Sequence, residues 1–320
     1  MKIMTGRGWF VLAVALVGIV PAQAQYPTRA VRLIVPFAPG SGTDSVARFI
    51  QPQMSAALGQ QLVIDNRAGA AGNLGAEIAA KAPADGYTVL MGNISHSISM
   101  TLYNRPGFDL MKDFEPVTSL ASGSFTLAAH PSLPAKSVKE LIAFAKKRPG
   151  EINVATAGAA LRLSAKMLDS MAGIKTTEIT YKSTPQAVTA VMSGEASLGF
   201  PATSAAIPHA RTGKLRALAV TGAQRSSMAP DVPTVAESGV PGYEVTTWYG
   251  LMVPARTPKE ISGRLHAAAA SALGHPEVKK RFATTDLEPA GSTPEQFGAF
   301  VRGEIAKWAK VIREAGITPE

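Results

Sequence analysis

Short apolar, β-branched runs alternate with helical stretches along most of the chain. A run such as Val31–Val35 is followed by a glycine-rich turn and then by apolar residues at helical spacing through Leu58. Repeated strand–turn–helix units are typical of doubly wound α/β sheets. The expected strands are 31–35, 62–64, 87–91, 125–129, 152–155, 178–181, 198–200 and 215–220.

Helix starts are marked by the pattern Ser or Thr, two residues, then Glu or Gln. It occurs at Ser137, Thr257 and Thr293, and the last two are followed directly by proline. In such a capping box the first and fourth residues satisfy backbone N–H groups at the helix start, and proline suits the first helical position. From Thr293 onward, apolar residues recur at helical spacing as far as Ile312, so we expect the last helix to bury one face.

The first residues read as a processing signal. Lys2 and Arg7 precede an apolar run over residues 9–20, which ends before the small-residue triplet Ala22-Gln23-Ala24. The run is shorter than the roughly 20 residues of a membrane span. We therefore expect residues 1–24 to be a cleaved signal peptide, with an exported mature chain starting at Gln25.

The composition of the chain excludes several kinds of site and partner. The chain of 320 residues has no cysteine, which excludes disulfides, thiolate metal sites and a lipid-bearing cysteine. Its net charge is +9, but the basic residues are scattered rather than interleaved with aromatics in one run, so we expect no nucleic-acid partner. The length left after the signal suits two domains.

Three glycine-rich turns, 36–44, 66–75 and 156–160, stand where a strand is expected to end and a helix to begin. Glycine lets a backbone approach a ligand closely, and a helix start presents free N–H donors with partial positive charge. Ligands of open α/β sheets settle at the carboxyl ends of the strands. The turns favour a pocket of backbone donors for carboxylates, although glycine is also ordinary turn punctuation.

Enzymatic interpretations are weaker. Gly40, Gly42 and Asp65 imitate a dinucleotide fingerprint, but the third glycine position is Ser45. No nucleophile elbow, phosphate loop or zinc-binding His-Glu-x-x-His motif occurs. The five histidines are isolated in sequence, so we expect no metal site and no cofactor; His96, after the third strand, is a candidate ligand contact.

Several segments together resemble one known family. They include VPFAPGSGTDSVAR at 35–48 and NRAGAAGNLGAE at 66–77, and the others are 85–88, 113–117, 214–220, 233–239 and 248–251. In this order they are similar to the Bug-type receptors of tripartite tricarboxylate transporters, and the likeness covers essentially the whole mature chain.

The resemblance implies a type II periplasmic binding protein fold, with two doubly wound α/β lobes and a ligand cleft between them. Lobe 1 would comprise 25–122 and 246–320, and lobe 2 would comprise 123–245. We place the two crossings near 120–124 and 243–250.

The same resemblance implies a periplasmic solute-binding receptor without chemistry of its own. Its partners would be a small organic acid and the membrane permease subunits of a tripartite tricarboxylate transporter, and we expect a monomer. Two alternatives stay open: a ligand-binding sensor for a membrane signalling partner, and an exported enzyme.

The ligand contacts implied by position come from loops of both lobes. In lobe 1 they are Phe37, Ala38, Ser41, Thr43, Asp44, Ala70, Ala71, Asn93, Ser95 and His96; in lobe 2 they are Thr156, Ala157, Thr184, Pro201, Ala202 and Thr203.

This chain departs from the family pattern in three places. Ser41 and Ser183 stand where glycines are usual, and the loop ending at Arg162 is about two residues short, with arginine at the position of a histidine. We hypothesise that the planar guanidinium of Arg162 meets a second carboxylate of the ligand. The alternative is that Arg162 lies on a solvated helix face.

Overall fold

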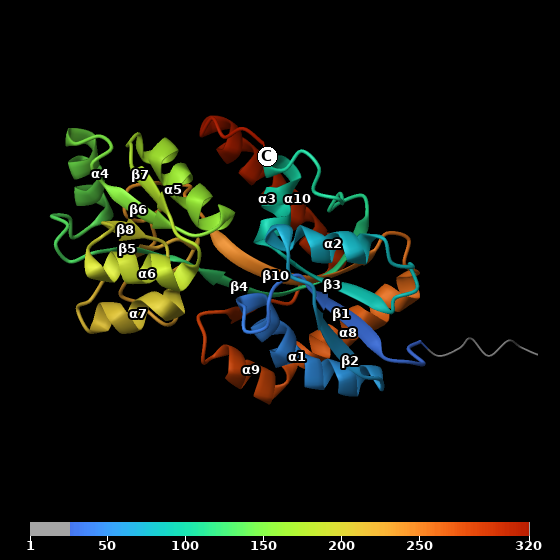
Figure 1. Cartoon of the computed structure of the whole chain (residues 1–320). Coiled ribbons are helices and arrows are strands. Elements are labelled where there is room, and N and C mark those ends of the chain that lie inside the picture. The colour runs from blue at the N-terminus through green and yellow to red at the C-terminus, as the bar shows by residue number, and fades with distance from the viewer. Residues whose placement is uncertain (1–25, 320) are drawn as a thin grey trace, which may run out of the picture.

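The computed structural model describes residues 26–319, so the predicted signal peptide and its cleavage site lie outside the described residues. Two α/β lobes, each with its own sheet, lie side by side (Figure 1). Between residues 26 and 319, no helix is both long and apolar enough to cross a bilayer.

Lobe 1 is built on a six-stranded sheet of order β11-β4-β10-β3-β1-β2. Its strands are β1 (Val31–Val35), β2 (Leu62–Asn66), β3 (Thr88–Asn93), β4 (Phe114–Ser124), β10 (Thr246–Pro254) and β11 (Glu288–Pro289). Its helices are α1 (Gly42–Leu58), α2 (Asn73–Ala80), α3 (Ile94–Leu102), α8 (Lys259–Gly274), α9 (Pro276–Phe282) and α10 (Pro294–Glu314), with the short 3₁₀ turn η1 (Ala70–Gly72).

Lobe 2 is built on a five-stranded sheet of order β7-β6-β8-β5-β9. Its strands are β5 (Thr126–Ala129), β6 (Asn153–Thr156), β7 (Thr177–Thr180), β8 (Leu198–Gly199) and β9 (Arg216–Val220). Its helices are α4 (Val138–Lys147), α5 (Ala159–Ala172), α6 (Thr184–Ser193) and α7 (Thr203–Arg211).

Helices cover both faces of the sheet in lobe 1. Helices α1, α8 and α9 share one core with Leu33 and Val35 of β1, whereas Ile34 belongs to the core under α2, α3 and α10. A strand covered on both faces reads as a nearly continuous apolar run, and in β1 only half-buried Arg32 interrupts it, so the strand could be predicted from the sequence.

The core under α3 and α10 continues into lobe 2. It contains Ile98 of α3 and Trp308 of α10 together with Leu161 and Leu168 of α5. Of the predicted apolar stripe on α10, Phe297, Val301, Trp308 and Ile312 are buried and Ile305 is partly buried. Helix α5 therefore packs on lobe 1 although its sheet belongs to lobe 2 (Figure 1).

The directions of the strands determine which strand ends point toward the other lobe. β4 ends at Ser124, directly before the chain enters lobe 2, and β10 runs antiparallel to both β4 and β3. β3 therefore points the same way as β4, and β1 and β2 are parallel to β3. The carboxyl ends of β1, β2 and β3 all point toward lobe 2.

In lobe 2, three strands end toward lobe 1. β5 begins at Thr126 beside the crossing and runs away from lobe 1, and β8 is antiparallel to it. β6 is parallel to β8, and β7 is parallel to β6. The carboxyl ends of β6, β7 and β8 therefore point back toward lobe 1, so the loops after six strands converge on the region between the lobes.

The predicted fold class is confirmed, with differences in detail. Both sheets are mixed, because β10 runs antiparallel in lobe 1 and β5 runs antiparallel to its neighbours in lobe 2. The long strands β4 and β10 were expected only as crossings.

Of the three predicted capping boxes, only the one at Thr293 is complete, with both reciprocal bonds to Gln296. Ser137 accepts from the Glu140 N–H, but the Glu140 carboxylate takes the N–H of Lys136 instead of that of Ser137. The box at Thr257 is wrong, since its hydroxyl donates to the carbonyl of Pro254 and α8 starts after Pro258.

Candidate functional site

The first glycine-rich loop leads from β1 into α1. Ala38 and Gly40 are exposed, whereas Thr43 and Asp44 are buried in the first turn of the helix. Ser41 is the N-cap, and its hydroxyl accepts the N–H of Asp44 at 3.2 Å. The remaining N–H groups of the first turn have no helical acceptor, so the exposed loop combines open backbone donors with the positive end of the α1 dipole.

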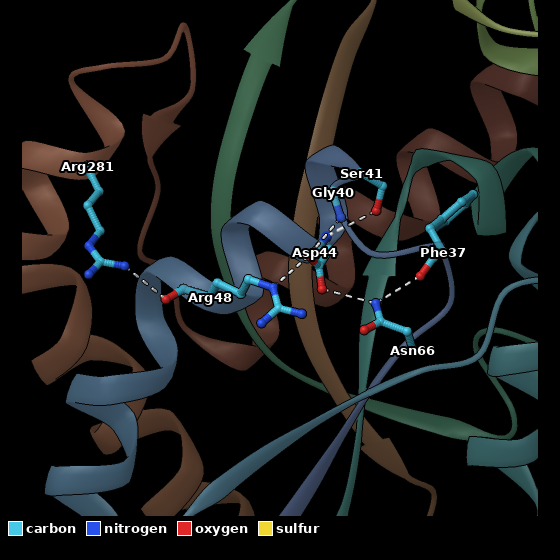
Figure 2. Close-up of polar contacts among 7 residues, drawn as sticks. All are labelled: Phe37, Gly40, Ser41, Asp44, Arg48, Asn66 and Arg281. Atoms are coloured by element: carbon cyan, nitrogen blue, oxygen red, sulfur yellow. Dashed lines mark hydrogen bonds and ion pairs between the residues drawn. The ribbon is translucent and has the colours of Figure 1, made fainter.

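Asp44 organises this loop from beneath (Figure 2). Its Oδ2 accepts the N–H of Gly40 at 2.9 Å and the Nε of Arg48 at 2.7 Å, and its Oδ1 accepts Nδ2 of Asn66 at 3.0 Å. Although burial alone raises a carboxyl pKa, the hydrogen bonds from Arg48, Gly40 and Asn66 hold the pKa of Asp44 below its usual value. Asp44 is therefore an internal carboxylate that shapes the loop.

The second loop, between β2 and α2, is held in an uncommon backbone conformation. Ala70 and Ala71 have φ of 47° and 56°, flanked by Gly69 and Gly72 at 146° and 99°. A non-glycine residue in the left-handed region costs about 1–2 kcal/mol, and such residues persist where the surroundings over-determine them. Both alanines are exposed, so their backbone faces outward from the carboxyl end of β2.

Asn66 and Phe37 connect this second loop to the first. Asn66 Nδ2 also donates to the carbonyl of Phe37 at 3.0 Å. At Gly72, a Cβ atom would lie 2.9 Å from Cζ of Phe37, so only glycine fits where the half-buried ring packs against the second loop.

The third loop, at the end of β3, is locked by Asn93 and His96. The Asn93 side chain accepts the N–H of Ser95 at 3.1 Å and donates to Oγ1 of Thr43 at 3.2 Å, which ties α3 to α1. Nδ1 of His96 accepts the N–H of Asn93 at 3.0 Å. A neutral ring therefore carries its proton on Nε2, which faces Gly72.

The His96 ring is completely buried, and burial lowers its pKa from 6.5 to about 4. The sequence makes His96 a candidate for direct contact with a ligand. In this conformation the neutral imidazole lies beneath the three loops of lobe 1 and supports them, while half-buried Ser95 lies nearer the surface. The predicted residues of lobe 1 are thus brought together in one interlocked group.

The predicted residues of lobe 2 occupy the carboxyl ends of β6 and β8 and the start of α6. Thr156 is fully buried, Ala157 is half-buried, and Thr184 is exposed as the first residue of α6. Pro201 is buried and its carbonyl accepts the N–H of Thr126, while Ala202 is bridged to Phe125. These positions face lobe 1, because the carboxyl ends of β6 and β8 point toward it.

Thr203 lies at the base of the crossing rather than at a loop tip. Its N–H donates to Oδ2 of Asp286 at 3.1 Å, and its hydroxyl hydrogen bonds with Ser124 and Thr126. Asp286 belongs to lobe 1 and is buried, so its carboxylate crosses between the lobes to the start of α7.

Arg162, in the first turn of α5, has a partner that the sequence analysis did not identify. Its Nε lies 3.6 Å from Oε2 of Glu178 on the edge strand β7. Oε1 of Glu178 accepts the hydroxyls of Thr156 at 2.8 Å and Thr180 at 3.2 Å. A charged residue on an edge strand usually faces solvent. The contact of Glu178 with Arg162 therefore became visible only in the fold.

Two further residues were missed. Asn66 directly ends the apolar run of β2, and a polar side chain at the carboxyl end of a parallel strand was a usable signal. Tyr249 of β10 is buried, and a Cβ on Gly42 would lie 2.6 Å from its hydroxyl oxygen. Tyr249 thus lies against the start of α1.

Comparison with known proteins gives a consistent family assignment. Residues 46–317 match the model of the tripartite tricarboxylate transporter family receptor. Protein BugT of Bordetella pertussis is 34% identical over 319 residues, which covers 98% of each chain.

Solved structures agree in fold. An R. palustris protein solved with adipate has 37% sequence identity and a TM-score of 0.80, covering 92% of this chain and 100% of that one. The periplasmic binding protein BugD has 33% identity and a TM-score of 0.77 over 92% of this chain and 100% of its own. MatC from Rhodopseudomonas palustris with bound malate has 32% identity and a TM-score of 0.75, over 90% and 100%.

Proposed function

The chain belongs to the tripartite tricarboxylate transporter receptor family, and from this premise we propose that it is a periplasmic receptor that captures a small organic acid and delivers it to the membrane subunits of such a transporter. The family and its structural neighbours are solute-binding receptors and not enzymes. The delivered form would be the closed protein, whose shape the permease recognises.

The observation that carries the proposal is the convergence of loops from both lobes. The carboxyl ends of β1, β2 and β3 point toward those of β6, β7 and β8. On the lobe 1 side, the start of α1 and the left-handed turn at Ala70 and Ala71 offer backbone donors. Such donors bind an anion without providing a nucleophile or a base.

The chemistry of the relatives supports a carboxylate as the captured group. The R. palustris protein was solved with adipate and MatC with malate, and both share the fold over nearly their whole length. In our proposal one carboxylate of the ligand lies against residues 38–42 and 70–71, and lobe 2 closes over its other end.

Export supports the same proposal. Relatives are described as periplasmic binding proteins, and the predicted signal would deliver this chain to the periplasm as a free monomer. Mass spectrometry of the protein secreted from its own full-length sequence should find Gln25 as the first residue; an intact N-terminus would contradict this part.

A thermal-shift screen of organic acids followed by calorimetry tests the proposed capture. A ligand that binds only the folded protein raises its Tm. We expect at least one carboxylate to stabilise the protein and to be recovered chemically unchanged. Turnover of the acid would favour an enzyme, and the absence of binding across the panel would remove the proposal.

Transport is separated from sensing in the producing cell. Deletion of the gene should abolish uptake of the acid identified in the screen, and a plasmid copy should restore it. Normal uptake combined with loss of an acid-induced transcriptional response would instead indicate a sensor.

A further inference from the structure

The wall that lobe 2 presents toward lobe 1 contains a cation and an anion that face each other. Arg162 and Glu178 approach to 3.6 Å, with side chains 38% and 20% exposed. Arg162 lies in the first turn of α5, and Glu178 lies on β7, whose carboxyl end points toward lobe 1. Both charges are therefore partly shielded from water but still reachable.

Glu178 is the centre of a small network. Its Oε1 accepts the hydroxyl of buried Thr156 at 2.8 Å and that of Thr180 at 3.2 Å, while its Oε2 faces Arg162. Thr156 and Arg162 are two of the residues proposed to meet a ligand. An internal carboxylate thus accepts the hydroxyl of Thr156 and faces the guanidinium of Arg162.

The network sets the local charge beside Arg162. With Glu178 ionised, its negative charge compensates Arg162, and the pair is neutral. A second ligand carboxylate placed here would lose its hydration beside an existing carboxylate, and like charges at short range oppose each other. A neutral ligand end avoids both penalties.

We infer that Glu178 is a specificity-determining residue that selects ligands with a single carboxylate over dicarboxylates. The inference rests on the proposed function, because it assumes that one carboxylate is held by the loops of lobe 1. It reverses the hypothesis that Arg162 receives a second carboxylate, since that guanidinium faces an internal one.

The test compares acids of equal length that differ by one carboxylate: butyrate with succinate, pentanoate with glutarate, and hexanoate with adipate. Calorimetry on the wild-type protein should give a Kd for the best monocarboxylate at least about tenfold lower than that of its dicarboxylate partner. Glu178→Gln keeps the shape and the acceptor for the threonine hydroxyls but removes the negative charge. It should tighten dicarboxylate binding about tenfold and leave monocarboxylate binding within about twofold.

Two variants make the result specific. Glu151→Gln is the matched control, because Glu151 also pairs with an arginine of lobe 2, Arg148 at 3.4 Å, but both side chains are more than half exposed. It should leave every Kd unchanged. Adding Arg162→Gln to Glu178→Gln should remove the gained dicarboxylate affinity, which shows that the gain comes from the guanidinium.

Each outcome separates the two claims. Wild-type protein that binds none of the acids, nor any acid of the broader screen, rejects the proposed function and the inference with it. Wild-type protein that prefers the dicarboxylate, or a Glu178→Gln variant that melts like wild type but keeps the same preference, rejects the inference and leaves the receptor function standing. Preference for an amino acid over both series would assign Glu178 to an ammonium group and also reject single-carboxylate selection.

Discussion

The carboxylate of Asp44 accepts a hydrogen bond from the side-chain amide of Asn66 across 3.0 Å, which ties the first glycine-rich loop to the second (Figure 2). The same buried carboxylate also holds the N–H of Gly40. The loops proposed to grip the ligand are thus shaped before any ligand arrives. Preorganised donors lose less free energy on binding than donors that must first be ordered.

Removing the Asp44 carboxylate should therefore weaken folding and binding together. We expect Asp44→Ala to lower the free energy of unfolding by about 2–3 kcal/mol, because Asn66 and Gly40 lose a buried charged acceptor. Ligand affinity should fall more than tenfold. Chemical denaturation and calorimetry measure the two effects.

Arg48→Gln provides the control for that experiment. Arg48 bonds the same buried carboxylate through a side chain that is 53% exposed. We expect a smaller loss of about 1 kcal/mol, because Asp44 keeps its hydrogen bonds from Gly40 and Asn66. An Arg48 variant as damaging as the Asp44 variant would show that the ion pair with Arg48, and not the bonds to Gly40 and Asn66, accounts for the losses.

Buried His96 should make the stability of the protein depend on pH. Its pKa is lowered from 6.5 to about 4 by burial, so between these values the unfolded chain binds a proton that the folded chain does not. Stability therefore falls as the pH drops from 6.5 toward 4, by about 1.4 kcal/mol per pH unit and about 3 kcal/mol in total.

Denaturation curves measured across that pH range check the prediction. His96→Gln removes the titrating ring, so the slope attributable to this group should disappear. The slope should persist in His209→Gln, a change at a half-buried histidine near the end of α7. Equal slopes in the wild type and in His96→Gln would assign the pH dependence to other groups.

Gly75 sets the distance between α2 and the first loop. A Cβ atom there would lie 2.8 Å from Cα of Pro36 and 3.0 Å from the carbonyl oxygen of Arg67, both of them backbone. Gly75→Ala should destabilise the protein by about 1–3 kcal/mol and lower ligand affinity, because the backbone of the first loop must shift.

The opposite result is expected at Gly303. It lies inside α10 with nothing within 4 Å of a Cβ, so Gly303→Ala should stabilise the protein by about 0.5–1 kcal/mol through helix propensity. Thermal melts of the two variants compare them directly. A neutral Gly75→Ala would show that the first loop adjusts without loss.

The buried bond between Asp286 and Thr203 should contribute to the packing of the two lobes. Asp286→Ala leaves the N–H of Thr203 without its acceptor, so we expect a loss of about 2 kcal/mol in denaturation experiments. Glu288→Gln is the control, since Glu288 accepts from Ser227 across the same boundary but lies in an exposed setting. Equal losses in the two variants would contradict a special role for the buried contact.

The sequence predicted those parts of the fold that depend on local pattern. Most expected strands lie within two residues of the observed ones, since buried parallel strands such as β1 leave nearly continuous apolar runs. The long strands β4 and β10 were not predicted as strands. Their partners lie far away in the chain, as when Tyr249 pairs with both Asn93 and Ala121, and local pattern carries no record of such pairing.

In the candidate site, too, features that depend on local sequence were predicted and long-range contacts were not. The glycine-rich turns of lobe 1 were found because strained or crowded backbone requires glycine, as at Gly72. The groups that connect the loops were missed, because Glu178 meets Arg162 and Asn66 meets Asp44 only after folding. Whether a polar side chain faces solvent, ligand or another side chain is decided by tertiary contacts.

A structure of the protein with its captured acid tests the central claim most directly. We predict one ligand carboxylate against residues 38–42 and 70–71, within hydrogen-bonding distance of the backbone N–H groups of Ala38, Gly42, Ala70 or Ala71, with lobe 2 residues around Thr156 covering its other end. A ligand bound outside the region between the lobes, or held by one lobe with the other turned away, would contradict the account.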